Sequence, residues 1–363
     1  MESRFLAERL RKLKEELENL KLEAYLCLHQ ANIQYFTGSP QAGELALGLL
    51  VTPDNTPTLF IPEMGAYQAQ RQTRIKLEME VFKVGDEALK RLRSRLKGFK
   101  VLGFDDASYA RVSKLKVKGL SLKPHPEIPE KLRMVKDEGE LEVLRKAARI
   151  LRRGFDAVLQ VLKPGVRERE VAAAAEYALR IGGSDFYAFP TLVASGSRSA
   201  YPHGSPTARR IRERDVVVVD LGAKFSGYCV DATRTFMVGK VKPAVSKAYK
   251  AVSKAYKAAV EGVKPGMRGF EADMLARKVI QERGFGGFFT HGLGHGVGLE
   301  VHEAPRLSPG SRDLLKVGST FTLEPGIYLP GRFGVRVEDT VLLAEGGVKV
   351  LTGWSGKEFI SLN

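Results

Sequence analysis

Four carboxylates in the second half of the chain occur in two similar strand-turn-strand patterns. The first pattern is DVVVVDLGAKFSGYCVDATRTF, at residues 215–236. Centring this hairpin between Phe225 and Ser226 pairs Asp220 with Asp231. Directly opposed side chains on neighbouring strands have Cβ atoms about 4.5–5.5 Å apart. Two carboxylates that close, beside a run of valines, repel each other and require a cation or a shared proton.

The second pattern, TFTLEPGIYLPGRFGVRVEDTVLL at residues 320–343, repeats this arrangement. Centring it on Gly331 pairs Glu324 with Glu338. A salt bridge to Arg234 or Arg336 explains one carboxylate in a strand, but four carboxylates in two matched pairs indicate a binuclear metal site.

Three of the six histidines lie close together in the segment HGLGHGVGLEVHE, at positions 291, 295 and 302. The first two have the spacing of a helical zinc motif, but glycines alternate through the segment and the glutamate that follows the first histidine in that motif is missing. We therefore expect an extended segment that a ligand or backbone approaches closely. His203 lies in the loop sequence SAYPHGSP. No such context surrounds the other two histidines, His29 and His125, which we interpret as structural.

The chain length of 363 residues predicts two domains. Hydrophobic periodicity predicts an α/β first domain. Its expected elements are a helix at 4–20, a strand at 24–28, a hairpin of 44–51 with 56–61, a basic helix at 88–99 and a strand at 101–105. Three prolines between 124 and 129 predict a linker, and Asp137 with Glu140 predicts a capped helix start. The expected domains are 1–130 and 131–363.

An internal repeat indicates the architecture of the second domain. LKPGVREREV at 162–171 matches VKPGMRGFEA at 263–272, and a helical stretch follows each copy. The two carboxylate hairpins come after these copies in the same order. We therefore expect an α+β domain of two half-domains related by a pseudo-twofold axis. The tandem heptad VSKAYKA at 245–258 predicts a surface helix with its lysines in solvent.

Composition excludes several classes of protein. Two cysteines, Cys27 and Cys229, are too few for a disulfide framework or a four-cysteine zinc site. The charged N-terminus is not a signal peptide and no run is apolar enough for a bilayer, so we expect a cytoplasmic protein without a membrane partner. The net charge of +16 requires a nucleic-acid partner to be considered. Asn and Gln total only 12, which indicates a thermophilic source.

Five separated motifs resemble one family of metallopeptidases, which contains prolidase, aminopeptidase P and methionine aminopeptidase. They are VDLGA, GYCVDATRTF, HGLGHGVGLEVHE, TLEPGIY and VRVED, in the family's order, and the resemblance covers residues 135–360. It implies the catalytic domain called the pita-bread fold. NIQYFTG at 32–38 resembles the N-terminal domain shared by prolidase, aminopeptidase P and creatinase. Methionine aminopeptidase lacks that domain, so the resemblance disfavours this branch.

The resemblance also implies a ligand set for two divalent metal ions per chain. Asp220 would hold one ion, Asp231 and Glu338 would bridge both, and His295 and Glu324 would hold the other. The family's metals are manganese, cobalt, zinc or iron. A carboxylate-rich set with one imidazole favours manganese or cobalt.

The implied chemistry is hydrolysis of the peptide bond before proline by a metal-bridging hydroxide. Glu324 is the expected general base, His302 would stabilise the developing oxyanion, and His203 would orient the carbonyl or the leaving side. His291 matches a further family histidine and is expected beside the substrate. Four aromatic side chains near the His203 loop are candidates for an apolar slot for the proline ring: Phe186, Tyr187, Phe189 and Tyr201.

Two arginines complete the expected substrate-binding group. Arg306, in HEAPRLS, matches an arginine of the short prolidases that would clamp the C-terminal carboxylate of a dipeptide. Arg336 lies two residues before Glu338, on the same strand face, and is expected to buttress the site more than to bind substrate.

The sequence therefore predicts a metal-dependent Xaa-Pro dipeptidase that forms a homodimer, as the family does. The alternative with the same chemistry is an Xaa-Pro aminopeptidase acting on longer peptides. A metal-free hydrolase of the creatinase type conflicts with five intact ligands. A non-enzymatic nucleic-acid-binding relative is a different class, which the spread of the charge and the intact ligands disfavour.

Overall fold

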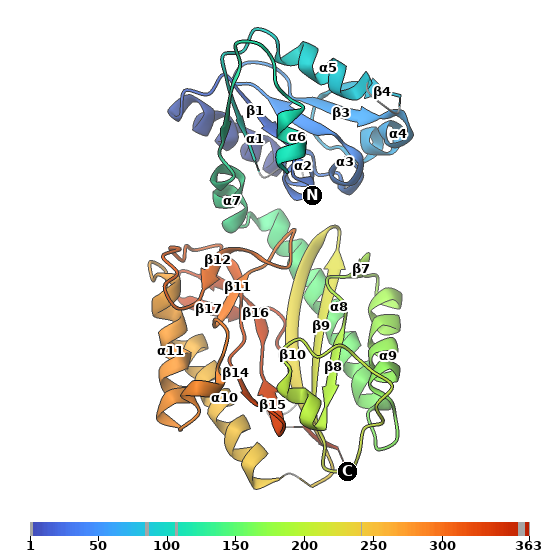
Figure 1. The fold of residues 1–363 in the computed structure, drawn as a ribbon, viewed down its shortest axis with the longest axis vertical. Helices are drawn as coiled ribbons and strands as arrows, with labels where there is room; N and C mark the ends of the chain where they lie inside the picture. Colours follow the sequence, from blue (N-terminus) through green and yellow to red (C-terminus); the bar gives the residue numbers. More distant parts are fainter. Residues whose placement is uncertain (1–2, 84–86, 106–107, 241, 355–359, 363) are drawn as a thin grey trace. The chain divides into compact units, whose positions relative to one another are not determined.

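The computed structural model describes residues 3–83, 87–105, 108–240, 242–354 and 360–362. The chain divides into two compact units, Met1–Arg133 and Met134–Asn363 (Figure 1). Among the described residues, no helix combines the length and the apolarity needed to cross a bilayer.

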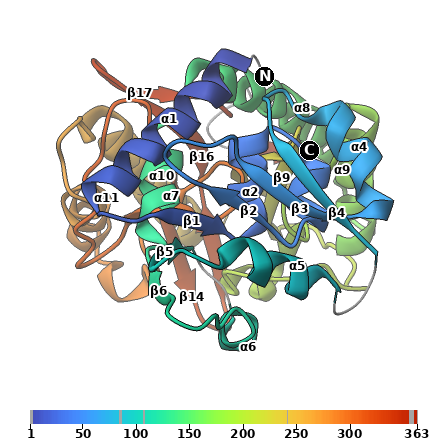
Figure 2. The same cartoon turned by 90° about the horizontal axis from the view of Figure 1, so that it is seen from above.

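The N-terminal unit is an α/β domain. Its strands are β1 (Ala24–Cys27), β2 (Gly48–Val51), β3 (Thr58–Pro62), β4 (Glu78–Phe82), β5 (Val101–Phe104) and β6 (Ser121–Pro124). The described residues form one six-stranded mixed sheet in the order β4-β3-β2-β1-β5-β6 (Figure 2). The helices are α1 (Ser3–Asn19), α2 (Gln30–Thr37), α3 (Pro40–Leu45), α4 (Glu63–Gln72), α5 (Glu87–Leu96), α6 (Tyr109–Ser113) and α7 (Glu127–Met134).

The periodicity of the first helix is confirmed. Helix α1 buries the leucines of one stripe: Leu6, Leu10, Leu13 and Leu17. Leu20 lies one residue beyond the helix and is exposed. The predicted hairpin is also present, with Leu49 paired to Leu59, but its first strand starts only at Gly48. Residues 40–45 form helix α3 instead, because Ser39 caps it and Pro40 occupies its first position.

The proline-rich stretch near residue 130 is regular structure, not an irregular linker. Strand β6 ends at Pro124, and helix α7 begins at Glu127 and continues past residue 130. Pro129 is compatible with this helix because the first-turn N–H groups have no intrahelical acceptor. The two units divide after Arg133.

The C-terminal unit contains two helix pairs and two large sheets (Figure 1). Its helices are α8 (Glu138–Val161), α9 (Glu168–Ile181), α10 (Pro243–Gly262), α11 (Gly269–Glu282) and the short 3-10 turns η1 (Gly196–Ala200) and η2 (Gly286–Phe288). Its strands are β7 (Phe186–Tyr187), β8 (Leu192–Ser195), β9 (Val216–Phe225), β10 (Tyr228–Val238), β11 (Gly294–Gly296), β12 (Glu303–Leu307), β13 (Thr320–Leu323), β14 (Gly326–Leu329), β15 (Phe333–Arg336), β16 (Asp339–Ala344), β17 (Gly347–Val350) and β18 (Ile360–Leu362).

One sheet has the order β18-β10-β9-β7, with β8 also on β9, and the other has the order β12-β11-β13-β16-β17. Strands β14 and β15 form a separate two-stranded sheet. Helix α8 begins with the predicted capping box of Asp137 and Glu140. Its apolar face packs on β9 and β10 beside α9.

The internal repeat forms equivalent turns in the two halves. Each Lys-Pro-Gly copy ends on a glycine with positive φ, 90° at Gly165 and 87° at Gly266. Each following helix, α9 or α11, starts with the same capping box, in which a glutamate carboxylate accepts from the backbone N–H three residues earlier. In Figure 1, α10 and α11 lie at the left of the C-terminal unit, and α8 and α9 lie toward its right, where α8 packs on β9 and β10.

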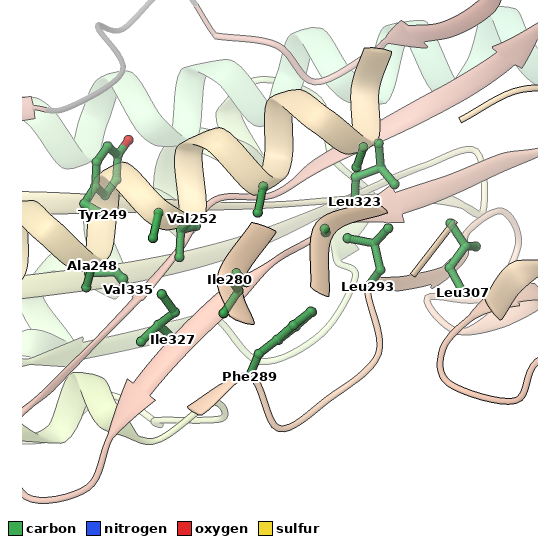
Figure 3. Close-up of a cluster of buried hydrophobic side chains, with 14 of the residues drawn as sticks. Ala248, Tyr249, Val252, Ile280, Phe289, Leu293, Leu307, Leu323, Ile327 and Val335 are labelled. Atoms are coloured by element: carbon green, nitrogen blue, oxygen red, sulfur yellow. The ribbon is translucent and has the colours of Figure 1, made fainter. Parts of the chain in front are cut away.

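The core of the second half confirms the interpretation of the heptad repeat. Helix α10 turns Ala248, Tyr249 and Val252 into a buried cluster with Ile280 of α11 (Figure 3). Strand residues such as Leu323 complete this cluster, while the lysines of the heptads lie in solvent. Helices α10 and α11 therefore hold in place strands β13 to β15, the strands next to Glu324 and Glu338.

Candidate metal centre

The hairpin of β9 and β10 turns later than the sequence suggested. Phe225 pairs with Tyr228, so the two turn residues are Ser226 and Gly227. Their φ values are 49° and 82°, as in the tight turns that match the twist of antiparallel strands. The predicted centre, between Phe225 and Ser226, was one residue too early.

This shift changes the partners of both aspartates. Asp220 pairs with Thr233, and Asp231 pairs with Gly222, so the prediction that the two aspartates face each other directly is wrong. The register moves by two residues, and an even shift keeps side chains on the same face of the sheet. Asp220 and Asp231 are therefore diagonal neighbours on one face, and both are buried.

The two glutamates lie where one hairpin passes from one sheet to another. On either side of them, β13 with β16 and β14 with β15 keep the predicted register centred on Gly331. At the break, the N–H of Glu324 donates to the carbonyl of Leu293, and the N–H of Glu338 donates to the carbonyl of Thr233. A backbone bond to β10 and one to the residue that precedes β11 thus place Glu338 and Glu324 beside these two strands.

The middle of the histidine segment, Gly294–Gly296, is extended, as its glycines predicted, whereas residues 298–302 form bends. His295 lies on strand β11, between β12 and β13. A Cβ at Gly294 would lie 2.0 Å from the carbonyl oxygen of Thr322, so only glycine allows the strands to approach this closely. His295 Nε2 is 3.4 Å from Glu324 Oε1 and 3.8 Å from Asp231 Oδ2.

The fold thus gathers carboxylates and an imidazole at one point. Ligand atoms of Asp231, His295 and Glu338 lie within 4.8 Å of one another. Burial, and then the neighbouring carboxylates, raise the pKa of Asp231 and Glu338 well above the ordinary range. Burial also raises the pKa of Glu324 and lowers that of His295. This cluster is unfavourable without positive charge.

The donor set fits a divalent cation. The Oδ1 atoms of Asp220 and Asp231 are buried and accept no hydrogen bond from any described residue. Buried carboxylate oxygens without donors are costly in a protein interior, and a metal ion satisfies them. Two threonines hold other oxygens of the cluster: Thr233 donates to Glu338 Oε2 and Thr322 donates to Glu324 Oε1.

Two further predicted histidines, His302 and His203, lie near this cluster. The ring of His302 meets that of His295 edge to face at 4.2 Å. Burial, and then His295 and His203, lower the pKa of His302 to about 4, so its ring is neutral at pH 7. His203 is exposed in the loop after η1 and acts electrostatically on both His302 and His291.

Arg306 lies on β12 directly opposite His295 on β11. Opposed residues of an antiparallel pair project from the same face, so Arg306 extends on the side of the cluster. Its side chain is exposed, and among the described residues no carboxylate forms an ion pair with its guanidinium. Its backbone N–H donates to Asp313, which fixes the strand.

Comparison with known proteins identifies the family. Residues 142–345 match the sequence model of Metallopeptidase family M24, and residues 9–135 match the Creatinase/Prolidase N-terminal domain. The first match alone covers more than half of the chain. The chain belongs to metallopeptidase family M24. The M24 family implies divalent metal ions for the cluster described above.

Relatives of this M24 chain match it over nearly their whole length. The Xaa-Pro dipeptidase of Pyrococcus furiosus is 39% identical over 350 residues, which are 96% of this chain and 98% of that protein. The solved Xaa-Pro dipeptidase from Bacillus anthracis has a TM-score of 0.92 at 33% identity and covers 98% of this chain and 100% of its own. The X-Pro aminopeptidase from Thermotoga maritima has a TM-score of 0.86 at 33% identity, covering 96% and 100%.

These likenesses confirm the predicted fold class of the M24 chain. An α/β creatinase-like domain precedes an α+β pita-bread domain with pseudo-twofold symmetry. Of the four aromatic candidates near the site, Phe189 packs over Gly222, the strand partner of Asp231. Phe186 lies farther along the sheet, where its ring contacts Tyr187 at a tilt of 39° and the guanidinium of Arg180 lies over it.

A hydrogen-bond network around Arg336 holds Asp220, one of the predicted ligands of the M24 site. Arg336 is 4% exposed, and its Nη2 donates to Asp220 Oδ2 at 2.7 Å. Its Nε donates to Thr233 Oγ1 at 2.9 Å, and its Nη1 donates to the carbonyl of Pro202 at 2.9 Å and to Tyr328 Oη at 2.8 Å. All three guanidinium nitrogens of Arg336 therefore donate to acceptors within the protein.

Tyr328, which the sequence analysis did not identify, fixes the state of His291. Arginine only donates, so the Tyr328 oxygen accepts from Arg336 and its proton goes to His291 Nε2, 2.9 Å away. Burial raises the pKa of Tyr328 to about 12, so it keeps this proton. The other nitrogen, Nδ1, then carries hydrogen and donates to the carbonyl of Gly292 at 2.8 Å. Both nitrogens of His291 are thus engaged within the protein.

We expect Tyr328→Phe to lower the free energy of unfolding by about 1–3 kcal/mol. The substitution leaves a buried arginine N–H without an acceptor and His291 without a donor. Urea denaturation of the two proteins measures the difference. Tyr67→Phe, at a tyrosine that is 75% exposed, is the matched control and should change stability little. Equal stability of Tyr328→Phe and the parent would contradict the network.

Proposed function

We propose that this M24 chain is a metal-dependent Xaa-Pro dipeptidase. The observation that carries the proposal is the juxtaposition of a buried carboxylate-imidazole cluster with Arg306 on the neighbouring strand, whose guanidinium forms no ion pair with a described carboxylate. The cluster supplies ligands, and Arg306 supplies a cation for a free C-terminus. The near full-length similarity to the Pyrococcus furiosus Xaa-Pro dipeptidase supports the same conclusion.

We assign two divalent ions to each chain, with manganese or cobalt favoured by the oxygen-rich ligands. The holding residues are Asp220, Asp231, His295, Glu324 and Glu338. Ligand atoms of Asp231, His295 and Glu338 lie within 4.8 Å of one another, and Glu324 Oε1 lies 3.4 Å from His295 Nε2. The Oδ1 atoms of Asp220 and Asp231, which accept from no described residue, also support this assignment. When bound, such ions act as Lewis acids toward water and the peptide carbonyl.

The remaining side chains have separate roles in this proposal. Glu324 Oε2 takes the proton of the attacking water, since Oε1 is occupied by Thr322. His302, neutral and exposed beside His295, donates toward the oxygen on which negative charge develops. His203 orients the substrate carbonyl or the leaving side from its exposed loop. His291 is hydrogen-bonded to Tyr328 and to the carbonyl of Gly292, so we assign it a supporting role and not contact with the substrate.

A bond before proline gives the site a distinct leaving group. The imide nitrogen carries no N–H and requires a proton when the bond breaks, and the ring requires an apolar surface. Phe189, packed on Gly222, offers such a surface beside Asp231. We assign Arg336 a supporting role and not a substrate-binding one, because its N–H groups donate to Asp220 and Tyr328.

The second candidate is an Xaa-Pro aminopeptidase, favoured by the similarity to the Thermotoga maritima enzyme. The test is to add each divalent metal to metal-free protein and to assay Gly-Pro, Met-Pro and Met-Pro-Ala. We expect hydrolysis of the dipeptides and poor hydrolysis of the tripeptide. A preference for Met-Pro-Ala would replace our proposal with the aminopeptidase. The homodimer and the thermophilic source stay predictions, measurable by light scattering and thermal unfolding.

We expect only weak binding of nucleic acid, despite the net charge of +16. Spread positive charge gives a non-specific attraction that salt removes by screening. Titration of duplex DNA at low and at physiological salt measures this directly. Sequence-selective binding that survives high salt would favour the non-enzymatic class of function.

A further inference from the structure

Glu168 is a buried carboxylate that no part of the proposed chemistry uses. It occupies the first turn of α9, and its side chain is 0% exposed. Oε1 accepts from the N–H and the hydroxyl of Ser195, at 2.8 and 2.7 Å. Oε2 accepts from the N–H and the hydroxyl of Thr207, at 3.0 and 2.6 Å, and from Arg198.

The partners of Glu168 are the two ends of one loop. Ser195 ends strand β8 and Thr207 closes the segment, so His203 lies between the two anchored residues. Burial acts to raise the pKa of Glu168, but hydrogen bonds from Thr207 and Ser195 outweigh it and the pKa is lowered. The group is therefore an ionised carboxylate held by five donors, and hydrogen bonds to an ionised carboxylate are about twice as strong as those between neutral groups.

The middle of the same loop is attached to the metal site. The N–H of Gly334 donates to Ser199 Oγ at 2.9 Å, and Arg336 donates to the carbonyl of Pro202, which precedes His203. Glu168 thus closes the base of the loop, while Arg336, bonded to Asp220, holds its tip. The position of His203 relative to the cluster depends on both attachments.

The other half of the unit holds its histidine segment in a similar way. Asp273 of α11, 1% exposed, accepts from the N–H of Leu293 at 2.9 Å and from Arg277. Arg277 in turn donates to the carbonyls of Phe289 and His291. In both halves, a buried carboxylate on the second helix fixes the segment that carries site histidines.

From these contacts we infer that Glu168 is a positioning residue for the reaction, acting through the loop that carries His203. The inference rests on the role of His203 in the proposed function. A purely structural anchor would change stability and every activity alike. A positioning residue instead loses its effect once His203 is gone.

The test is a double-mutant cycle of Glu168→Gln with His203→Ala, assayed on Met-Pro with saturating metal. We expect Glu168→Gln to lower kcat/KM about tenfold or more in the parent but less than about threefold in the His203→Ala background. Bound metal should equal that of the parent. Glu170→Gln is the matched control, since Glu170 is exposed on the same helix and glutamine preserves its cap.

A readout independent of substrate is cleavage by trypsin after Arg198, mapped by mass spectrometry. Glu168→Gln should expose this bond, and Glu170→Gln should not. If Glu168→Gln does not fold, Thr207→Val removes one donor at constant volume, and the same cycle applies with a smaller effect.

The outcomes separate the two proposals. Coupling to His203 together with faster cleavage supports the inference. Additive losses, or unchanged cleavage, overturn it and leave the dipeptidase proposal standing. If the parent hydrolyses no Xaa-Pro substrate, the proposed function fails, and the proteolysis alone decides whether Glu168 anchors the loop.

Discussion

Asp231→Asn is expected to remove measurable Xaa-Pro hydrolysis and to lower the bound metal by at least one ion per chain. Asp231 lies at the centre of the cluster, with ligand atoms beside those of His295 and Glu338. Loss of a residue that merely supports a ligand weakens metal binding about 10- to 100-fold, so loss of the ligand itself has a larger effect. Metal analysis after dialysis and an assay on Met-Pro measure both effects.

The stability of the metal-free variant separates a lost ligand from a damaged fold. Burial and the neighbouring carboxylates raise the pKa of Asp231, so its charged form destabilises the metal-free folded protein at neutral pH. Asparagine removes that charge. We expect metal-free Asp231→Asn to unfold at no lower temperature than the metal-free parent. Asp54→Asn, in an exposed turn, is the control and should retain metal and activity.

Arg306→Ala is expected to reduce kcat/KM for Met-Pro about 10- to 100-fold and to affect Met-Pro-Ala much less. A dipeptide presents a carboxylate directly after proline, where a longer peptide presents a neutral amide. Arg306 extends from the strand position opposite His295, without an ion pair to any described carboxylate. Charge-assisted hydrogen bonds to a carboxylate contribute about 1.5–3 kcal/mol, and 1.4 kcal/mol corresponds to a factor of about ten.

The comparison of substrates is the decisive part of this experiment. Arg312→Ala removes another exposed guanidinium, from the segment that follows β12, and should leave both rates unchanged. Equal losses on Met-Pro and Met-Pro-Ala would show that Arg306 does not bind the substrate carboxylate. A parent enzyme that prefers the tripeptide would favour the aminopeptidase.

Strand patterns in the sequence predicted the carboxylate pairs because the side-chain period of a strand is two. The Glu324 hairpin had the right register, since Gly331 marks its centre. The Asp220 hairpin was shifted by two residues, because a serine and a glycine with positive φ form the turn. Because the shift is even, both aspartates still lie on the predicted face of the sheet, and the predicted carboxylate cluster is unchanged.

The supporting residues were beyond prediction because their partners are distant in sequence. Tyr328 and Arg336 lie on one hairpin, but Tyr328 reaches His291, 37 residues away, only after the histidine segment has packed against that hairpin. Glu168 reads as an ordinary glutamate of a helix first turn, where acidic residues are common on the surface. Its burial depends on a loop that ends at Thr207, so spacing along α9 gives no signal.

The activity of metal-free protein tests the central claim most directly. The protein is treated with a chelator, dialysed, shown to lack divalent metal, and assayed on Met-Pro before and after manganese or cobalt is returned. Burial and the neighbouring carboxylates raise the pKa of Asp231, and the Oδ1 atoms of Asp220 and Asp231 accept from no described residue. These features predict no hydrolysis without metal and its recovery with two ions per chain. Full hydrolysis by protein that holds no metal would contradict the account.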